Sequence, residues 1–310
     1  MSKLTELMDY TLAGNTKRTR ILNSYSFTNN YPNLKSLLLS EGMDSDELLR
    51  TEVISAINAG AENRRVMRNV LPIIPTNSKR VRPIYGTKPS GNLAYQIAEG
   101  AAYPTKTQYY SSGSGVDIKK YGLKSSITTE LIEDAEFGII EYELRKVGEA
   151  IENKLNEVAI GALLENHNGT TPADEDPAGS ILQTVDLSDS YEKLNTLGWT
   201  AKDLILRPRS YGQIISGAQL NFNGNDCFGL SLHVLDTPYA GTKYWDDADA
   251  SSHYYGLLLD SDNYGFIAMK NDITVNSLKD PIHDLVNFIV DIRFGVGVTH
   301  NDAAVRILTK

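Results

Sequence analysis

The longest regular pattern of apolar residues in the chain lies between residues 137 and 166. Apolar side chains recur there at steps of three and four: Phe137, Ile140, Leu144, Val147, Ile151, Leu155, Val158 and Ala162. This spacing is typical of one face of an amphipathic helix, and Glu141 with Arg145 adds an i,i+4 ion pair off that face. The pattern predicts one helix from Phe137 to Asn166, which ends at His167-Asn168-Gly169.

A weaker helical pattern precedes it near the N-terminus. Asp44 and Glu47 have the spacing of a capping box. Five apolar residues then share one helical face: Leu48, Leu49, Val53, Ile54 and Ile57. The residues before Asp44 contain only short helical patterns, interrupted by Asn, Tyr and Pro. We therefore expect residues 1–75 to form an N-terminal arm.

Residues 76–118 differ from the rest in their low apolar content. Three strand-like segments, at 79–85, 93–98 and 105–110, are separated by glycines and prolines. A two-stranded hairpin buries little apolar surface of its own and is only marginally stable alone. Loops of this length in compact chains are usually functional. The segment is predicted to be an extended hairpin loop that docks on another surface.

Short apolar runs alternate with turns through residues 180–270, at 204–206, 230–235, 255–259 and 264–269, which predicts a mixed domain with several short strands. Three more strands are predicted at 273–275, 285–298 and 304–308, and two of them are apolar enough to lie under the long helix. A sheet packed on one long helix is an α+β architecture. The remaining domains are then a peripheral domain with the long helix at 119–179, an axial domain at 180–270, and strands at 271–310 that return to the peripheral domain.

The charge pattern limits the possible partners. The net charge of −9 argues against a dedicated nucleic-acid binder, whose affinity rests on Lys and Arg at phosphates. Basic residues nevertheless cluster between Arg64 and Lys88, and acidic residues cluster at 174–189 and 236–262. These clusters are either two solvated faces or a surface that meets copies of itself. The single cysteine, Cys227, rules out an internal disulfide framework and suits a reducing cytoplasm.

The sequence offers little support for catalysis. No two of the five histidines have i,i+3 or i,i+4 spacing. The glycine-rich Ser112–Gly115 segment lacks the Lys-Ser/Thr of a phosphate loop, and no Gly-x-Ser-x-Gly elbow occurs. We therefore predict a protein that is not an enzyme, with no catalytic residue, cofactor or metal site. An enzyme with a substrate domain at 180–270 is the alternative from another class.

Several short motifs follow one another along the chain: Glu99–Pro104, Ile127–Ala135, Leu206–Arg209, Val234–Pro238, Asn287–Arg293 and Ala303–Ile307. Their order and spacing resemble the Johnson (Hong Kong 97-type) fold of the major capsid proteins of tailed double-stranded DNA viruses. The resemblance covers residues 76–310. It implies an N-terminal arm, an extended loop, a long spine helix, and peripheral and axial domains.

The resemblance also implies a function. The chain is expected to self-assemble into the icosahedral capsid shell that encloses viral double-stranded DNA. Its expected partners are copies of itself in hexamers and pentamers, portal and scaffold proteins, and packaged DNA bound without sequence specificity; no membrane is involved. Its expected location is the virion capsid, assembled in the host cytoplasm. An encapsulin-type nanocompartment shell, which shares the fold but usually has a shorter chain, is the closest alternative.

Residues at contacts between subunits are predicted from the basic stretch, the loop motif and the final strands. They are Arg64, Arg65, Arg68, Arg80, Arg82, Lys88, Glu99, Tyr103, Asp284, Asp291 and Arg293. The type member of the fold forms an isopeptide bond between a loop lysine and an asparagine before the penultimate strand. Asp284 occupies the corresponding stretch here and Asn287 comes later, so no such cross-link is expected.

Overall fold

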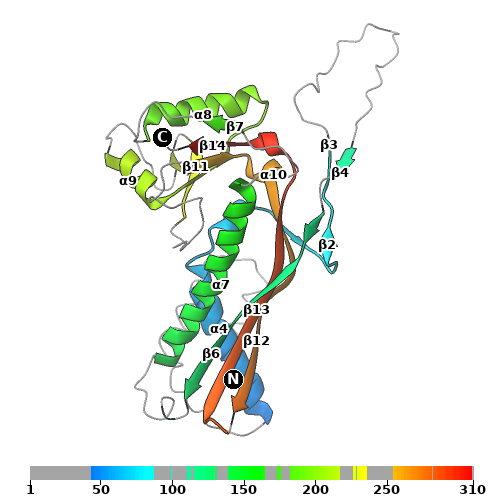
Figure 1. Cartoon of the computed structure of the whole chain (residues 1–310), viewed down its shortest axis with the longest axis vertical. Helices are drawn as coiled ribbons and strands as arrows, with labels where there is room; N and C mark the ends of the chain where they lie inside the picture. Colours follow the sequence, from blue (N-terminus) through cyan, green and yellow to red (C-terminus); the bar gives the residue numbers. More distant parts are fainter. Residues whose placement is uncertain are drawn as a thin grey trace. The chain divides into compact units, whose positions relative to one another are not determined.

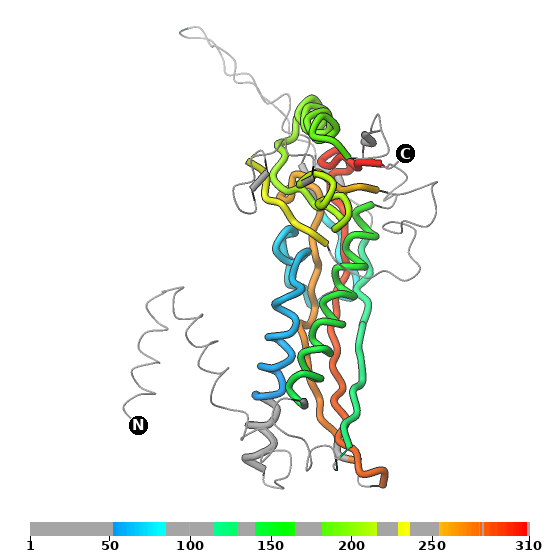
Figure 2. Tube along the Cα trace, turned by 90° about the vertical axis from the view of Figure 1, so that its left-hand side faces the viewer, coloured from blue at the N-terminus to red at the C-terminus, as the bar shows by residue number. Residues whose placement is uncertain are grey.

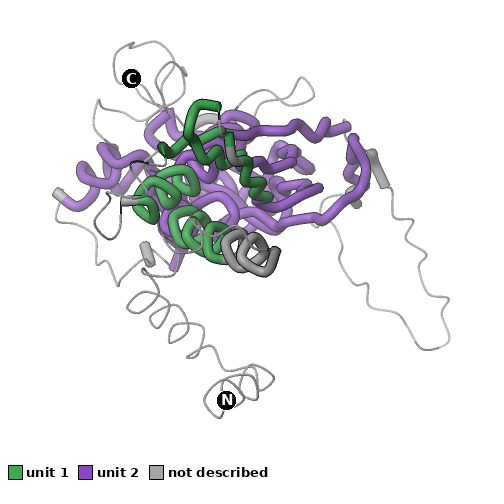
Figure 3. Tube along the Cα trace, turned by 90° about the horizontal axis from the view of Figure 1, so that it is seen from below, with its two compact units in different colours: residues 1–61, 123–149, 274–290 green, residues 62–122, 150–273, 291–310 purple. Residues whose placement is uncertain are grey.

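A computed structural model describes residues 43–86, 99, 110–112, 115–128, 130, 139–164, 173–175, 182–216, 226–227, 229–235, 254–280 and 282–308 (Figure 1). The chain divides into two compact units, each assembled from three separate stretches (Figure 3). Unit 1 comprises residues 1–61, 123–149 and 274–290, and unit 2 comprises residues 62–122, 150–273 and 291–310.

The described residues form the following helices and strands. The helices are α4 (Met43–Glu62), α5 (Met67–Val70), α7 (Ile139–Leu164), α8 (Thr184–Thr196), α9 (Pro208–Ser216) and α10 (Ser261–Tyr264), with a 3-10 turn at Asn301–Ala303. The strands are β1 (Ile73–Pro75), β2 (Arg80–Val81), β3 (Ile84–Gly86), β4 (Tyr110–Ser112), β5 (Val116–Asp117), β6 (Lys119–Thr128), β7 (Ala173–Glu175), β8 (Asp203–Leu206), β9 (Asp226–Cys227), β10 (Leu230–Val234), β11 (Tyr254–Leu259), β12 (Gly265–Asp280), β13 (Leu285–Val298) and β14 (Ala304–Leu308).

Two larger sheets contain most of these strands. One has the order β1-β12-β13-β6, and the other has the order β7-β14-β11-β8-β10-β9. The apolar runs predicted at 204–206, 230–235 and 255–259 form β8, β10 and β11 of the second sheet. The α+β class predicted from the sequence is confirmed.

One strand pairs differently from the predicted division. β14 lies between β7 and β11, with Val305 opposite both Ala173 and Leu258. It does not join β12 and β13, with which residues 271–310 were grouped. Because β14 is almost fully buried, its apolar sequence suits either sheet, and only its pairing partners distinguish them.

The predicted long helix is confirmed as α7, but the buried stripe changes course near its end. Leu144, Val147, Ile151 and Leu155 are buried as expected, whereas Val158 and Ala162 are only half-buried. Ala159 and Leu163 are fully buried instead. The last turns of α7 make contacts over a wider arc: Asn156 Oδ1 accepts a hydrogen bond from the Met67 N–H, and the Leu163 carbonyl accepts one from the Tyr264 hydroxyl. These long-range contacts cannot be inferred from the period of the helix.

Residues 43–75 are part of the folded core rather than of the predicted arm. Val53 and Ile57 of α4 are buried in unit 1, and Met67 of α5 is buried in unit 2. β1 pairs in parallel with β12, with Ile73 opposite Ile267. The apolar face noted at Val53 and Ile57 therefore packs within the subunit. The rest of the proposed arm, residues 1–42, lies outside the described residues, and the other predicted domain boundaries stay predictions.

α4 and α7 lie side by side in unit 1, and glycines at their contact bring the two backbones together (Figure 2). A Cβ atom at Gly60 would lie 2.1 Å from the Arg145 carbonyl oxygen, and one at Gly148 would lie 2.0 Å from the Ile57 carbonyl oxygen. Real Cβ atoms do not approach backbone oxygens so closely. Each helix therefore uses a glycine where the other helix touches it, although glycine costs a helix about 0.5–1 kcal/mol relative to alanine.

Gly148→Ala is expected to destabilise the subunit by about 1–3 kcal/mol, the usual cost of overpacking a core, because the new methyl group meets backbone rather than a movable side chain. Gly161→Ala on the same helix is the matched control, since its Cβ would meet nothing within 4 Å. That substitution should stabilise by up to about 1 kcal/mol through helix propensity. Urea unfolding of the two variants measures both values, and a stabilised Gly148→Ala variant would contradict the close helix contact.

Candidate subunit interface

The segment predicted to be an extended loop begins and ends as an antiparallel hairpin in unit 2. β2 pairs with β5, with Arg80 opposite Asp117 and Val81 opposite Val116. Farther out, β3 pairs with β4 through Ile84 to Ser112 and Gly86 to Tyr110. Among the described strands, each of these two sheets has two members. The pairing agrees with the predicted hairpin, whose residues 87–109, apart from Glu99, lie outside the described part of the chain.

The start of the hairpin is anchored on its own subunit. We call Lys79–Val81 and Val116–Ile118 the hairpin root. Val116 is buried against Phe266 and Ala268 of β12, and Val81 and Ile118 pack around them. The Ile118 N–H donates to the Lys79 carbonyl at 3.0 Å across the two legs. The root is thus part of the unit 2 core, in contrast to the sequence-based expectation that the whole segment docks elsewhere.

Beyond the root the hairpin becomes exposed. Ile84 of β3 leaves 75% of its surface open to solvent, which is high for an isoleucine on a strand. Arg82 is also exposed. Within the root itself, Arg80 makes an exposed ion pair with Asp117 at 3.4 Å, and such pairs contribute little to stability. Ile84 of β3 and Arg82 before it are therefore not buried in their own unit.

Arg68, one of the predicted contact residues, pairs with carboxylates of its own subunit. Its Nε lies 2.9 Å from Oε1 of Glu152 on α7, and its Nη1 lies 3.0 Å from Oδ1 of Asp272 on β12. The Arg68 and Glu152 side chains are 7% and 0% exposed, respectively. Arg68 serves the fold of its own chain, because both carboxylates that it pairs with belong to the same unit.

This buried cluster shifts the pKa values of its two acids in opposite directions. Burial raises the pKa of Glu152 above its usual value, and the neighbouring Arg68 and Arg65 only partly offset this effect. Burial also acts to raise the pKa of Asp272. There, however, Arg68 and the hydrogen bond from the Ile273 N–H outweigh burial and leave the pKa below its usual value. The protein environment thus disfavours the charged form of Glu152 and favours the charged form of Asp272.

The other basic residues near Arg68 also have partners within their own unit. Arg65 lies 3.8 Å from Glu62 in an i,i+3 pair. The Arg64 carbonyl oxygen accepts a hydrogen bond of 2.7 Å from the Asn156 side chain. The charge pattern of the sequence showed the basic cluster but not these partners. Among the described residues 64–82, the exposed members of the cluster are Lys79, Arg80 and Arg82.

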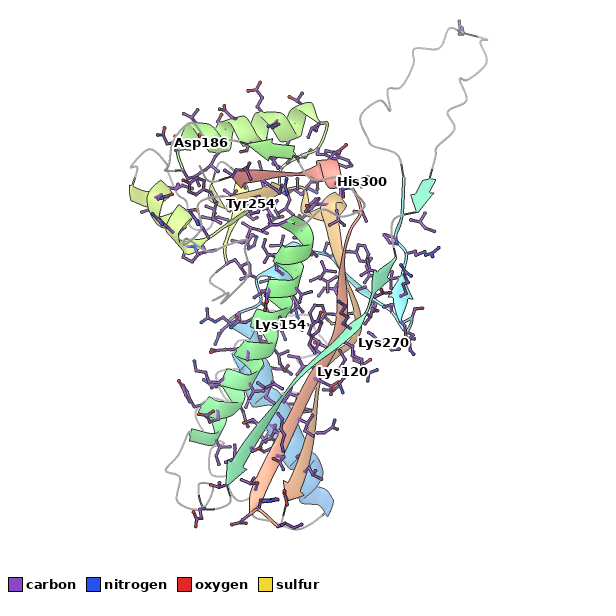
Figure 4. All side chains as sticks on the ribbon, in the orientation of Figure 1. Lys120, Lys154, Asp186, Tyr254, Lys270 and His300 are labelled. Carbon is purple, nitrogen blue, oxygen red and sulfur yellow. The ribbon has the colours of Figure 1, made fainter. Side chains whose placement is uncertain are left out.

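The contact residues predicted near the end of the chain also differ in how far they are buried within the subunit. Asp291 of β13 is buried and pairs at 3.3 Å with Lys120 of β6, which Figure 4 labels. Arg293, two residues on, is half-buried. Asp284 is exposed, with a positive φ of 55° in the turn between β12 and β13. Glu99 is exposed, whereas Lys88 and Tyr103 lie outside the described residues.

Exposed apolar side chains are candidate contact residues that the sequence analysis missed. In unit 1, Ile282 in the turn between β12 and β13 is 87% exposed, and Leu278 of β12 is 60% exposed. In unit 2, Val185 of α8 is 59% exposed. An isoleucine directly after Pro281, in a turn where apolar residues are unusual, was the available signal for Ile282.

Metal-ligand clusters and membrane-spanning helices are the last two features considered among the described residues. No three of their His, Cys, Asp or Glu side chains gather closely enough to hold a metal ion. None of the helices in the described ranges combines the length and apolarity needed to cross a bilayer.

Comparison with known families decides between the candidate classes. A family model described as "Phage capsid protein" matches residues 112–307, which is more than half of the chain. The chain belongs to the phage capsid proteins. No match appears among curated proteins. The match runs from the last residue of β4 through most of β14. It thus includes the long helix, the six-stranded sheet and all strands of the four-stranded sheet except β1.

The fold of this capsid protein is similar to that of solved capsids at low sequence identity. A structure from Microbacterium phage Oxtober96 has a TM-score of 0.57 at 13% identity and covers 78% of this chain and 90% of its own. A capsid of a native GTA particle has a TM-score of 0.56 at 12% identity, with 79% and 89% covered. A virus-like particle from Pyrococcus furiosus has a TM-score of 0.57 at 15% identity, with 82% and 96% covered. The predicted Johnson fold is confirmed.

The family also fixes the general role of the capsid protein. It is a structural protein that forms a virion shell, and its family indicates a structural rather than an enzymatic role. The family of phage capsid proteins favours this virion shell over the encapsulin-type alternative.

Proposed function

We propose that this capsid protein builds an icosahedral shell of hexamers and pentamers around double-stranded DNA, and that its hairpin binds a neighbouring copy. The observation that carries the proposal is the exposure of Ile84 on β3. A two-stranded ribbon with a 75% exposed isoleucine gains little stability from its own subunit. Contact with a second copy would bury Ile84 and order the ribbon.

Further partners and the place of assembly are inferred from the resemblance to capsid proteins of tailed viruses. We propose portal and scaffold proteins as partners and the host cytoplasm as the place of assembly. The single cysteine supports a reducing compartment. The net charge of −9 supports an inner wall that holds DNA weakly and without sequence specificity, because few phosphates would be neutralised.

Charged contacts between copies remain part of the proposal at the exposed positions. The basic side chains of Arg80 and Arg82 and the acidic side chains of Glu99 and Asp284 are accessible. Lys88 and Tyr103 are proposed on the sequence alone. Arg64, Arg65, Asp291 and Arg293 are weaker candidates, because they are at least partly buried within the subunit.

Replacing residues 88–108 by a short Gly/Ser linker tests the proposal. The variant keeps both paired sections of the hairpin, since the root packs on β12. It should remain soluble and folded by circular dichroism, because the removed residues lie outside the root. It should fail to form closed shells in sedimentation and electron microscopy. Normal shells from this variant would contradict the role of the loop.

A matched pair at Ile84 separates the apolar contact from the presence of the loop. Ile84→Ser should weaken assembly while leaving the unfolding midpoint of the free subunit nearly unchanged, because the side chain is exposed in the subunit. Ile84→Val, which keeps the apolar character, should assemble almost normally. Equal assembly of both variants would mean that Ile84 makes no contact with a neighbour. A test for nuclease-protected DNA inside the shells examines the proposed cargo.

A further inference from the structure

Two glycines of β13 face the hairpin root. The root can lie this close to the strand because glycine has no side chain. A Cβ at Gly295 would lie 2.7 Å from the Asp117 carbonyl oxygen and 2.9 Å from Cγ1 of Val116. A Cβ at Gly297 would lie 2.5 Å from Cγ2 of Val116 and 2.7 Å from the Phe266 ring. Because alternate residues of a strand share a face, Gly295 and Gly297 lie on the same side of the sheet.

Backbone freedom does not explain these glycines. Among the described residues, the glycines with positive φ are Gly198 and Gly229, so Gly295 and Gly297 adopt angles that any residue could adopt. Glycine inside a strand costs stability, and it often marks the close approach of another backbone. At Gly295 that approaching backbone is Asp117 in β5 of the hairpin root.

Few other described contacts hold the root, apart from the continuation of its second leg into β6, which pairs with β13. β2 and β5 contribute only two residue pairs, and a short two-stranded ladder is not stable alone in water. Its apolar support consists of Val116 with Val81 and Ile118 against Phe266 and Ala268. The fit of Val116 and Asp117 over Gly295 and Gly297 is thus a close contact between the root and the sheet.

We propose that Gly295 and Gly297 are positioning residues for assembly. They form a glycine seat that fixes the hairpin root on β13 and thereby aims the hairpin as it leaves the subunit. The five steps along the chain from Val81 to Gly86 span about 16 Å as a strand. A tilt of roughly 10° at the root would therefore move Gly86 by about 3 Å over this span, enough to disrupt a packed contact. This consequence for assembly rests on the proposed binding of the hairpin to a neighbouring copy.

Gly295→Ala in the full-length protein tests the seat directly, because its new methyl group meets a backbone oxygen that only a shift of the root can relieve. Hydrogen exchange of the Ile118 amide, which bonds to the Lys79 carbonyl, reports the root. We expect exchange there to accelerate about tenfold or more. The Thr299 amide, bonded to the Tyr264 carbonyl at 2.8 Å, reports the adjacent core and should keep its protection.

Matched variants keep the test decisive. Gly212→Ala, whose Cβ would meet nothing within 4 Å, should leave both amides unchanged. Val116→Ala empties the seat without adding an atom to β13, so it should release the Ile118 amide even if Gly295→Ala disturbs the core. If the Ile118 amide stays protected in both Gly295→Ala and Val116→Ala, the proposal that the glycine seat fixes the hairpin root is wrong.

Assembly of the same variants separates this inference from the proposed function. If the wild-type protein and Gly212→Ala form shells while Gly295→Ala with an intact core forms open or misshapen ones, the seat aims the hairpin. If Gly295→Ala frees the Ile118 amide and still forms normal shells, the aiming role is wrong. If the 88–108 linker variant also forms normal shells, the proposed contact of the hairpin with a neighbour is wrong as well. If the linker variant forms no closed shells while Gly295→Ala does, the proposed contact stands and only the aiming role is wrong.

Discussion

Arg68→Met is expected to lower the free energy of unfolding of the subunit by about 3–5 kcal/mol at neutral pH, the usual cost of removing one partner of a buried ion pair. Methionine has a similar length but leaves Glu152, which is fully buried, without its cation. Asp272 loses the same partner but is partly exposed and can be hydrated. Urea unfolding of the unassembled subunit measures the change.

The loss should shrink as the pH falls. Burial already raises the pKa of Glu152 in the wild type, and removal of Arg68 removes the largest effect that lowers it. A carboxyl group whose folded pKa exceeds its unfolded pKa favours folding in its protonated form. Its contribution is therefore fully present below the unfolded pKa and is lost as the pH rises through the folded value. Arg68→Met should regain stability relative to the wild type as the pH falls from neutral through the raised folded-state pKa of Glu152.

Glu152→Gln is the matched control for this prediction. It removes the charge that burial disfavours, while Arg68 keeps its 3.0 Å pair with Asp272. The control should therefore cost less than about 1 kcal/mol and should remove the pH dependence when it is combined with Arg68→Met. A double variant with the same pH dependence as Arg68→Met would show that Glu152 is not the titrating group.

Leu155→Ala is expected to destabilise the subunit by about 2–5 kcal/mol. Leu155 is fully buried in the middle of the unit 2 part of α7, so its removal leaves a cavity rather than exposing a surface. Val158→Ala on the same helix should cost less than about 1 kcal/mol, because Val158 is half-buried. A cost below about 0.5 kcal/mol for Leu155→Ala would contradict the assigned register of the helix.

The elements with the strongest local pattern were predictable from the sequence. α7 differs from its predicted bounds by two residues at each end, and β8, β10, β11 and β13 lie where apolar runs predicted strands. These elements are buried along a face or on both sides, so their periodicity reflects their packing directly. β12 joins two predicted strands into one of 16 residues, because Lys270 to Asp272 continue the ladder despite their polarity.

Features that depend on distant residues were not predictable. The partner of Arg68 is 84 residues away, and nothing in the local sequence distinguishes a buried arginine from a solvated one. Asp186 was grouped with exposed acids, but it is buried and accepts a hydrogen bond of 2.7 Å from the Gln183 N–H at the start of α8. The hairpin could be predicted from its composition, whereas its glycine seat could not, because Gly295 and Gly297 lie some 180 residues beyond the root that they receive.

The place of β14 has a consequence for how the protein is made. This strand lies between β7 and β11, so the six-stranded sheet cannot close until the ribosome has synthesised residues 304–308. Until then the β11 edge, with the fully buried Leu257 and Leu259 on its strand, lacks its neighbour and is open to pairing with other chains. A translating chain is therefore open to aggregation at this edge from the synthesis of β11 until β14 has been made. Chaperones that bind extended apolar segments would be needed at that stage, before any shell can begin to form.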